Sequence, residues 1–402
     1  MSMACRRLAG ENGTESPASH RWSERQANLP ISWGGISIVA LALSISAASV
    51  HSQAPTVLRE SMCRACLSIE QGITLGDATD AGAVSVGRGL LQLRDGSFLH
   101  ADGRGGVLRR FSSRGLPLGE IGRAGSGPLE FREIDWIMRD SRDTLVVFDL
   151  GNGRASTISP TLKQVRQFSI THPVTSASFL PTGHIVANIH FADSPRVGVP
   201  VHVIDRNSGT ILASFGRDDD ETFDSRAAWA GWREIAVSPA GTIWTARRNA
   251  YRLEEWDAHG RKLRSLERRV NWFVPYSVRT RLSPTEAPQP HVERIHMDSD
   301  GRLWVFIAVP AADWRRSVVA RRPSPGILPG FEPVSLSGIY DTIVEIIDTS
   351  SGSVIASARL ADYAWGMLSD GLIYSDAQAE DGVPRYRLWT AAFRGPTSTT
   401  RR

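Results

Sequence analysis

Three patterns in this chain contain residues that could do chemistry. The first is the glycine-rich stretch from Ile121 to Phe131, IGRAGSGPLEF, whose backbone N–H groups could hold a phosphate. A phosphate loop needs a helix after its glycines, so that the helix N-terminus faces the anion. Here the glycines lead into PLEFREIDWIM, which is typical of a strand. We therefore interpret the stretch as a tight turn between structural units, with Phe131 filling the gap between them.

The second pattern is a pair of cysteines, Cys63 and Cys66, in SMCRACLS. A C-x-x-C pair attaches c-type haem when His follows, but Leu67 follows here. A structural zinc site would need a second pair, and the one other cysteine, Cys5, lies near the N-terminus. A redox role favours a helix after the pair, whereas LSIEQGITL is typical of a strand. The pattern predicts a disulfide between Cys63 and Cys66.

The third pattern is the acidic run RDDDETFDSR, which contains Asp218 to Asp224. It lacks the alternate spacing and the glycine of a calcium loop, so we interpret it as a solvated loop. Calcium is the one cofactor that the composition suggests at all. No G-x-S-x-G motif occurs and no three metal ligands share one register, so neither a catalytic residue nor a metal site is predicted.

The N-terminal region has the composition of an export signal. Arg21 and Arg25 precede the apolar run from Ile36 to Val50, which is shorter than the roughly 20 apolar residues that span a bilayer. We predict a signal peptide with a long basic region over residues 1–53, export to the periplasm or the medium, and no stable membrane insertion. The net charge of +4 is small for 402 residues and does not favour nucleic acid as a partner.

These patterns are embedded in a repeat of six copies, each with a strand, a tight turn and a second strand. The turns are centred on Gly96, Asp143, Gly183, Gly241, Gly301 and Gly371. Two and three residues after each centre the side chains are apolar or aromatic, which predicts second strands buried on both faces. A third strand follows each copy, and a fourth strand follows all copies except the last.

The missing fourth strand has a candidate near the N-terminus, where Ile69 to Asp77 has the form of a strand. Pairing it with the last copy would close a ring and remove the open sheet edge. We therefore predict an all-β, six-bladed β-propeller with four-stranded antiparallel blades over residues 67–394. A short segment with the cysteines, 54–66, precedes the propeller, and a disordered tail, 395–402, follows it.

The linker GRAGSGPLEFREIDWI resembles the G-x-x-G-x-G-P-x-E-F linker of NHL-type propellers, and DSDGRLWVF resembles their strand–turn–strand signature. The chain is also similar to TolB-like and exported bacterial six-bladed propellers of unknown function. Their prelude is a cysteine-containing start and a TLGD-like strand, here Thr74 to Asp77. The resemblance covers Leu67 to Phe393 and implies a propeller fold and a tendency to bind ligands, without implying a reaction.

Strand parity divides the connections between two faces of the propeller. The connections between first and second strands, and between third and fourth strands, are short and define the short-turn face. The long connections, residues 216–231, 267–290 and 308–338, define the long-loop face. Binding is usually built on long loops over a rigid scaffold, so we predict that this face is the working surface. Its candidate contacts are aromatic and arginine side chains, as in interface hot spots: Trp229, Trp232, Trp272, Phe273, Trp314, Arg315 and Arg316.

First strands begin on the long-loop face and run beside the propeller axis. Polar residues stand at their starts: Arg88, Asp135, Thr175, Arg233, Glu293 and Tyr363, with Glu234 and Arg294 one position further on. Two positions after the starts the residues are apolar: Leu90, Ile137, Ala177, Ile235, Ile295 and Trp365. This pattern predicts a channel mouth that can hold water or a ligand, although simple hydration of strand ends would give the same pattern.

These features favour a non-catalytic extracytoplasmic binding module, expected as a monomer, whose partner is a protein or a small molecule. The alternative is a propeller hydrolase, lactonase or lyase with a metal at the axial channel, since such enzymes converge carboxylates or histidines on the axis. The carboxylates available here are Asp135, Glu234 and Glu293, while His296 lies deeper and shares its register with no second histidine.

Overall fold

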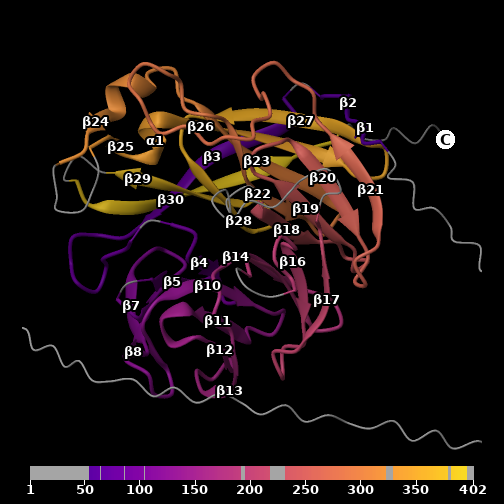
Figure 1. Ribbon diagram of the computed structural model, residues 1–402. Coiled ribbons are helices and arrows are strands. Elements are labelled where there is room, and N and C mark those ends of the chain that lie inside the picture. The colour runs from indigo at the N-terminus through magenta and orange to yellow at the C-terminus, as the bar shows by residue number, and fades with distance from the viewer. Residues whose placement is uncertain are drawn as a thin grey trace, which may run out of the picture. The chain divides into compact units, whose positions relative to one another are not determined.

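The computed structural model describes residues 54–63, 65–85, 87–103, 105–191, 195–217, 231–322, 329–378 and 382–395. The strands form six small sheets, which are arranged as the blades of a propeller (Figure 1). The predicted fold class, an all-β six-bladed propeller, is confirmed. The predicted signal peptide lies outside the described residues.

The first three blades are four-stranded sheets whose strands follow one another along the chain. The first blade contains β4 (Leu90–Gln92), β5 (Phe98–Asp102), β6 (Val107–Phe111) and β7 (Pro117–Ile121). The second contains β10 (Ile134–Arg139), β11 (Leu145–Asp149), β12 (Arg154–Ile158) and β13 (Gln164–Ser169), with the 3-10 turn η1 (Leu150–Asn152). The third contains β14 (Val174–Phe179), β15 (Ile185–Ile189), β16 (Val201–Ile204) and β17 (Ile211–Phe215).

The last three blades carry additions to this plan. The fourth contains β18 (Arg233–Val237), β19 (Ile243–Arg247), β20 (Arg252–Trp256) and β21 (Lys262–Glu267). The fifth contains β22 (His291–Met297), β23 (Arg302–Pro310), β26 (Tyr340–Asp348) and β27 (Ser353–Leu360). Its insertion between β23 and β26 contains η3 (Trp314–Ser317), β24 (Val318–Ala320), β25 (Phe331–Pro333) and α1 (Leu336–Ile339). The sixth contains β28 (Ala364–Ser369), β29 (Leu372–Gln378), β30 (Pro384–Phe393) and β3 (Leu67–Leu75).

The N-terminal strand β3 closes the ring. It pairs antiparallel with β30, with Leu67 opposite Phe393 and Leu75 opposite Tyr386. In Figure 1 the indigo β3 therefore runs beside the yellow β30. This pairing confirms the prediction that the N-terminal strand completes the last blade, and it covers the edge that β30 would otherwise leave open.

The segment before β3 makes two further pairings that the sequence analysis did not predict. β1 (Thr56–Val57) runs parallel to β21 of the fourth blade, and β2 (Arg59–Glu60) runs parallel to β27 of the fifth. The guanidinium of Arg268 lies 2.8 Å from the carboxylate of Glu60 and 3.1 Å from that of Glu345. The N-terminal segment and β3 thus connect the outer strands of three consecutive blades.

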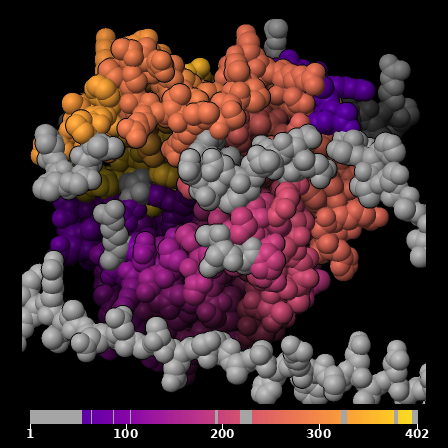
Figure 2. Space-filling model, viewed as in Figure 1, coloured from indigo at the N-terminus to yellow at the C-terminus, as the bar shows by residue number. Residues whose placement is uncertain are grey.

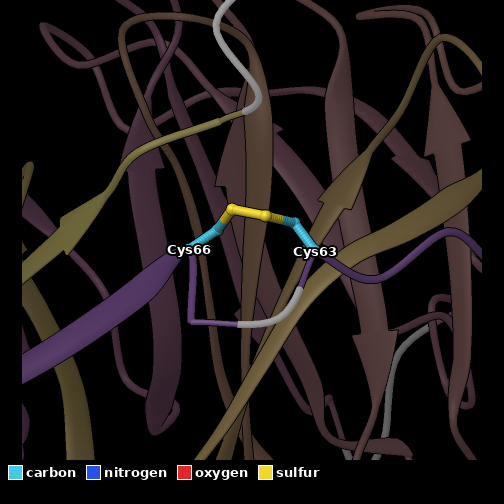
Figure 3. The surroundings of a disulfide bond; sticks show 2 residues. All are labelled: Cys63 and Cys66. Carbon is cyan, nitrogen blue, oxygen red and sulfur yellow. A yellow bond between two sulfur atoms is a disulfide. The ribbon is translucent and has the colours of Figure 1, made fainter.

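A disulfide joins Cys63 to Cys66 within this N-terminal segment, and the two Cα atoms lie 5.5 Å apart (Figure 3). The backbone N–H of Cys63 donates to the carbonyl of Ile355 in the fifth blade. The carbonyl of Cys66 accepts from the N–H of Arg394, just after the last strand of the sixth blade. The disulfide therefore lies where the chain passes from the fifth blade to the sixth.

The six turn centres share one backbone conformation. Each has a positive φ: 80° at Gly96, 61° at Asp143, 84° at Gly183, 87° at Gly241, 79° at Gly301 and 79° at Gly371. Glycine adopts this region without strain, which explains why five of the six copies use it. Asp143 is the one turn centre among these six that is not glycine, and aspartate is among the residues that tolerate this conformation. Its carboxylate accepts from the N–H of Arg94 in the first blade at 3.1 Å.

The core of the propeller lies between the blades. The second strands β11, β15 and β19 are buried along their whole length, as the paired apolar positions predicted. The buried side chains of the described residues form six clusters, and each cluster combines residues from two neighbouring blades. The interior is therefore a ring of blade interfaces, and the innermost strands are left to line the axis.

The glycine-rich stretch is one of the joints in this ring. β8 (Arg123–Ala124) and β9 (Glu130–Phe131) pair in parallel, and the Phe131 ring is fully buried. The carboxylate of Glu130 accepts from the N–H groups of Ser126 at 2.9 Å and Gly127 at 2.7 Å. The amide groups that could have held a phosphate thus bind a side chain of the same loop. The structural interpretation of this stretch is confirmed.

Candidate functional site

First strands begin with β-bulges beside the axis. The register of four of them shifts by one residue near the start: at Asp135 in β10, Thr175 in β14, Glu293 in β22 and Trp365 in β28. A bulge adds a residue to one strand and re-aims the side chains next to it. Because β22 has a bulge, both Glu293 and Arg294 reach charged partners near the axis.

Two buried glutamates and three arginines meet on the axis. We call Arg88, Glu234, Arg248, Glu293 and Arg294 the axial ion cluster. Both glutamates are 1% exposed. Arg88 donates from Nε and Nη2 to Oε1 of Glu293, at 2.9 and 2.6 Å. Arg248 donates from Nη2 to the other oxygen of Glu293 at 2.6 Å and from Nη1 to Oε1 of Glu234 at 3.2 Å.

Two further side chains complete the surroundings of Glu293. The Tyr363 hydroxyl donates to its Oε2 at 2.6 Å, and His291 Nε2 lies 3.3 Å from the same oxygen. Burial acts to raise the pKa of Glu293, but the charge of Arg88 and the hydrogen bonds from His291 and Tyr363 hold it at about 2. Glu293 is therefore ionised throughout the physiological pH range.

Glu234 is in a less favourable position than Glu293. Burial raises its pKa, and the nearby charges of Arg88 and Arg294 offset this effect only in part. Its Oε2 accepts no hydrogen bond from the described residues, although Nη1 of Arg294 lies 3.6 Å away. Three guanidinium groups face two carboxyl groups in the cluster. The cluster is thus positive whether Glu234 is ionised or neutral.

Arg294 has contacts near the axis with Trp136, Trp365 and Glu234. Its guanidinium lies 4.6 Å from the centre of the Trp136 ring, and its Nε donates to the carbonyl of Trp365 at 3.3 Å. Gly366 leaves the space for this side chain, because a Cβ there would come within 2.6 Å of Cγ of Arg294. Among the described residues, none accepts a hydrogen bond from Nη2 of Arg294.

A cavity of about 970 Å³ extends from this cluster along the axis. Arg88 and Arg294 line its inner end, which we call the floor. Its walls include one apolar side chain from the first strand of each blade: Leu90, Ile137, Ala177, Ile235, Ile295 and Met367. Five of these belong to the predicted apolar layer. The sixth blade contributes Met367, and Trp365, the predicted residue, does not line the cavity; the register of β28 is irregular at Trp365 and again before Ser369.

The rim of the cavity is formed by turns between first and second strands. Arg139, Asp140 and Arg142 come from the second blade, and Asp298, Ser299 and Asp370 come from the fifth and sixth. At the rim His296 Nε2 lies 2.9 Å from Oδ1 of Asp370. The cavity therefore opens on the short-turn face, opposite the long loops.

The predicted channel-mouth residues divide into two groups. Arg88, Glu234, Glu293, Arg294 and Tyr363 come together as described. Thr175 contributes its carbonyl, which accepts from Nη1 of Arg88 at 3.1 Å.

Asp135 and Arg233 have local contacts instead. The carboxylate of Asp135 accepts from the N–H of Val174 at 2.8 Å, at the junction of the second and third blades. Arg233 is 2% exposed, and its Nη1 donates to the carbonyl of Trp232. Sequence reasoning missed Arg248 and His291. His291 could have been found, since it stands two positions before Glu293, whereas Arg248 follows a second strand that no parity rule brings to the axis.

The predicted loop-face contacts are only partly on the surface. Phe273 and Trp314 are 2% and 4% exposed, so they pack inside the protein and cannot serve as exposed anchors. Trp272 packs against Tyr251, with the ring centres 6.4 Å apart. The Trp232 ring lies 5.5 Å from the guanidinium of Arg248.

The remaining loop-face candidates differ in position. Arg315 and Arg316 are exposed on η3. The segment with η3, β24, β25 and α1 forms the orange surface at the upper left of Figure 2. Trp229 and the acidic run Asp218 to Asp224 lie outside the described residues.

Neither a metal site nor a membrane span is found in the described part of the chain. Within it, no three His, Cys, Asp or Glu residues are grouped as metal ligands. No helix there is long and apolar enough to cross a membrane.

No family model and no curated protein matches the sequence. Among solved structures, the chain is similar to an exported protein of Bacteroides fragilis, with 10% identity and a TM-score of 0.54 over 85% of this chain and 99% of the other. A DUF4221 family member from Bacteroides vulgatus has 10% identity and a TM-score of 0.56 over 82% and 99%. A virginiamycin B lyase from Staphylococcus aureus has 10% identity and a TM-score of 0.43 over 80% and 99%. At such identities the likeness shows the fold alone.

Proposed function

We propose that the protein is an exported binding protein that holds a small molecule in the axial cavity without transforming it. The observation that carries this proposal is the cavity of about 970 Å³, which all six blades line. Ligand pockets have volumes of roughly 300–1,000 Å³. Export is supported by the signal-like N-terminus and by the fold that the chain shares with an exported Bacteroides protein.

The groups beside the cavity favour binding over catalysis. A general acid or base works best when its pKa lies near the operating pH. Glu293, with a pKa of about 2, is far from that range. Both of its oxygens already accept hydrogen bonds from arginine, at 2.6 Å from Arg88 and 2.6 Å from Arg248. A carboxylate bound in this way orients the arginines rather than moving protons.

A cavity-filling variant tests this proposal. Ser178 lines the cavity on β14 and is half-buried, so Ser178→Phe should occupy part of the volume. Ser113, in an exposed turn of the first blade, provides the matched control Ser113→Phe. A panel of anionic, neutral and cationic small molecules, including esters and lactones, would be screened by melting temperature and by turnover.

We expect at least one chemical class to raise the melting temperature of the wild type and of Ser113→Phe, but not of Ser178→Phe, with no compound consumed. Turnover that is lost in Glu293→Ala or Asp135→Ala would establish the hydrolase or lyase alternative instead. A panel that never distinguishes Ser178→Phe from the wild type would contradict cavity binding.

A second candidate function is binding of a partner protein on the long-loop face. It is favoured by the exposed Arg315 and Arg316 on η3, close in sequence to Val319 and Phe331, which are 41% and 39% exposed. Arginine beside an exposed aromatic ring is typical of interface hot spots. If a partner binds here, Arg315→Ala with Phe331→Ala should weaken binding, whereas Arg261→Ala on the short-turn face should not. Equal binding by both variants would exclude this surface.

A further inference from the structure

The cavity has a cationic floor, a band of aliphatic side chains on its walls and a charged rim. Arg88 and Arg294 lie at the floor, and the walls carry aliphatic side chains such as Leu90, Ile137 and Ile295. A ligand that matches this gradient has one charged end and an apolar body. The positive cluster at the floor requires that the charged end be an anion.

The two floor arginines differ in how fully their donors are used. Arg88 donates from Nε, Nη1 and Nη2 to Glu293 and to the carbonyl of Thr175. Arg294 donates only from Nε, and none of the described residues accepts from its Nη2. Arg294 is 9% exposed, and its Nη2 is not fully buried, so this donor faces the cavity. An anionic group in the cavity would accept a charge-assisted hydrogen bond from it.

Glu234 does not fill this role. Its Oε2 stays 3.6 Å from Nη1 of Arg294, which is beyond hydrogen-bond distance, and the same oxygen accepts no other hydrogen bond within the described chain. The guanidinium of Arg294 also lies over the Trp136 ring, 4.6 Å from the ring centre. The planar fork of N–H donors on a guanidinium matches the two oxygens of a carboxylate.

We propose that the axial cavity binds an organic monoanion with an apolar body, with the anionic group on Arg294 and the body along the first strands. This inference rests on the proposed function, in which the cavity holds a small molecule. A single negative charge fits better than a phosphate dianion, because the donors of Arg88 are already used and the cluster has an excess of one to two positive charges, depending on the ionisation of Glu234. An organic cation is excluded by the positive floor.

The test measures binding of paired probes by isothermal titration calorimetry. Decanoate is compared with decanol, 2-naphthoate with 2-naphthol, and decyltrimethylammonium serves as the cation. The variants are Arg294→Gln, which removes the proposed anchor, and Glu234→Gln, which removes the carboxylate beside it. Arg261→Gln is the control, because Arg261 lies in an exposed turn of the fourth blade and pairs with Asp257.

We expect at least one of the two acids to bind about tenfold or more tightly than its alcohol, since a hydrogen bond to a charged group contributes that much. The cation should not bind. Arg294→Gln should weaken binding of the acid by about tenfold, whereas Arg261→Gln should bind the acid as tightly as the wild type does. At pH values where Glu234 is ionised, Glu234→Gln should strengthen binding of the acid several-fold, because the substitution then raises the positive charge of the floor. A variant that merely loosens the fold would not tighten binding, so this opposite effect separates recognition from structural damage.

The contrary results distinguish failure of the anion preference from failure of cavity binding. If acid and alcohol bind equally and Ser178→Phe blocks both, the cavity binds ligands but the preference for an anion is wrong. The same conclusion follows if neither acid binds, while another compound binds the wild type and not Ser178→Phe. If an acid binds and Ser178→Phe has no effect, the site lies elsewhere and both proposals fail. If no probe or panel compound binds, both proposals fail as well.

Discussion

The two faces of the propeller hold their carboxylates in opposite environments. On the short-turn face, aspartates begin the turns and accept hydrogen bonds from backbone N–H groups two residues later: Asp95, Asp140, Asp205, Asp257, Asp298 and Asp348. The pKa is lowered below its ordinary value for Asp95, Asp140, Asp205, Asp257 and Asp348. On the long-loop face, burial raises the pKa of Asp135, Asp362 and Asp376.

The difference follows from what each face has to do. A short turn exposes several N–H groups within a few residues, and an ionised carboxylate satisfies them while remaining partly in water. A long insertion instead covers carboxylates at the strand ends and removes them from water. The short-turn face is thus a repeated rigid frame around the cavity, and the packing of the long-loop face depends on pH. The pattern of this face is not uniform, because the pKa values of Asp77, Asp102 and Glu130 are lowered. Glu293 is the fully buried exception, because arginines and a tyrosine keep it ionised in spite of burial.

The largest expected change in stability comes from removing the carboxylate of Glu293. Glu293→Ala leaves Arg88, Arg248 and Tyr363 without their shared acceptor, and breaking a buried ion pair costs about 3–5 kcal/mol. Chemical denaturation should show this loss in the free energy of unfolding. Glu286→Ala, in an exposed loop of the same face, should change it by less than about 0.5 kcal/mol. Equal stabilities would mean that the axial ion cluster does not hold the blades together.

The second expected change is a gain in stability when Asp376 is replaced. Asp376 is 8% exposed, and burial raises its pKa to about 6, while the Ser337 hydroxyl donates to its Oδ1 at 2.6 Å. The folded protein therefore loses stability as the pH rises from 4 to 6, because the unfolded chain ionises this group more easily. Asp376→Asn removes the loss and should stabilise the protein by about 2 kcal/mol at pH 7.5 and by little at pH 4. Melting curves at the two pH values would measure it, and equal gains at both would contradict the raised pKa.

A smaller loss of stability tests the backbone conformation of the short turns. Gly301 has φ of 79°, and a Cβ there would meet nothing within 4 Å, so Gly301→Ala isolates the cost of the backbone conformation. That cost should be about 1 kcal/mol, measured as a fall in the free energy of unfolding. Gly87, which also has open space around it but no positive φ, provides the control Gly87→Ala. Similar effects of the two variants would show that the turn conformation is not the cause.

The smallest effect concerns a single turn carboxylate. Slight burial acts to raise the pKa of Asp257, but hydrogen bonds from the N–H groups of Arg261 and His259 hold it below its ordinary value. Its stabilising effect is therefore complete above its unfolded pKa of about 4 and is lost as the pH falls below that value. Asp257→Ala should cost about 1 kcal/mol at pH 7 and almost nothing at pH 2.5. If the free energy of unfolding falls by the same amount at both pH values, the ionised carboxylate of Asp257 is not what stabilises its turn, and the contrast between the two faces does not extend to this aspartate.

The sequence by itself determined the architecture. The turn centres from Gly96 to Gly371 and the apolar residues after them are local signals, since a positive φ and a strand buried on both faces restrict residue types wherever they occur. The strand within Ile69 to Asp77 could be recognised because the last copy lacked a partner. Phe131 was recognisable because its loop runs into a strand and not into a helix.

Only the tertiary structure decided which side chains meet on the axis and where the cavity opens. The bulges at Glu293 and Trp365 shift the alternation by one residue, and nothing in the composition of a strand reveals a bulge. Arg248 reaches Glu293 from a separate blade, a contact that depends on how the blades pack. Burial of Phe273 and Trp314 likewise depends on neighbours distant in sequence. Residue types restrict the conformation of their own segment of chain. Which side chains meet on the axis depends instead on how the six blades pack in the closed ring.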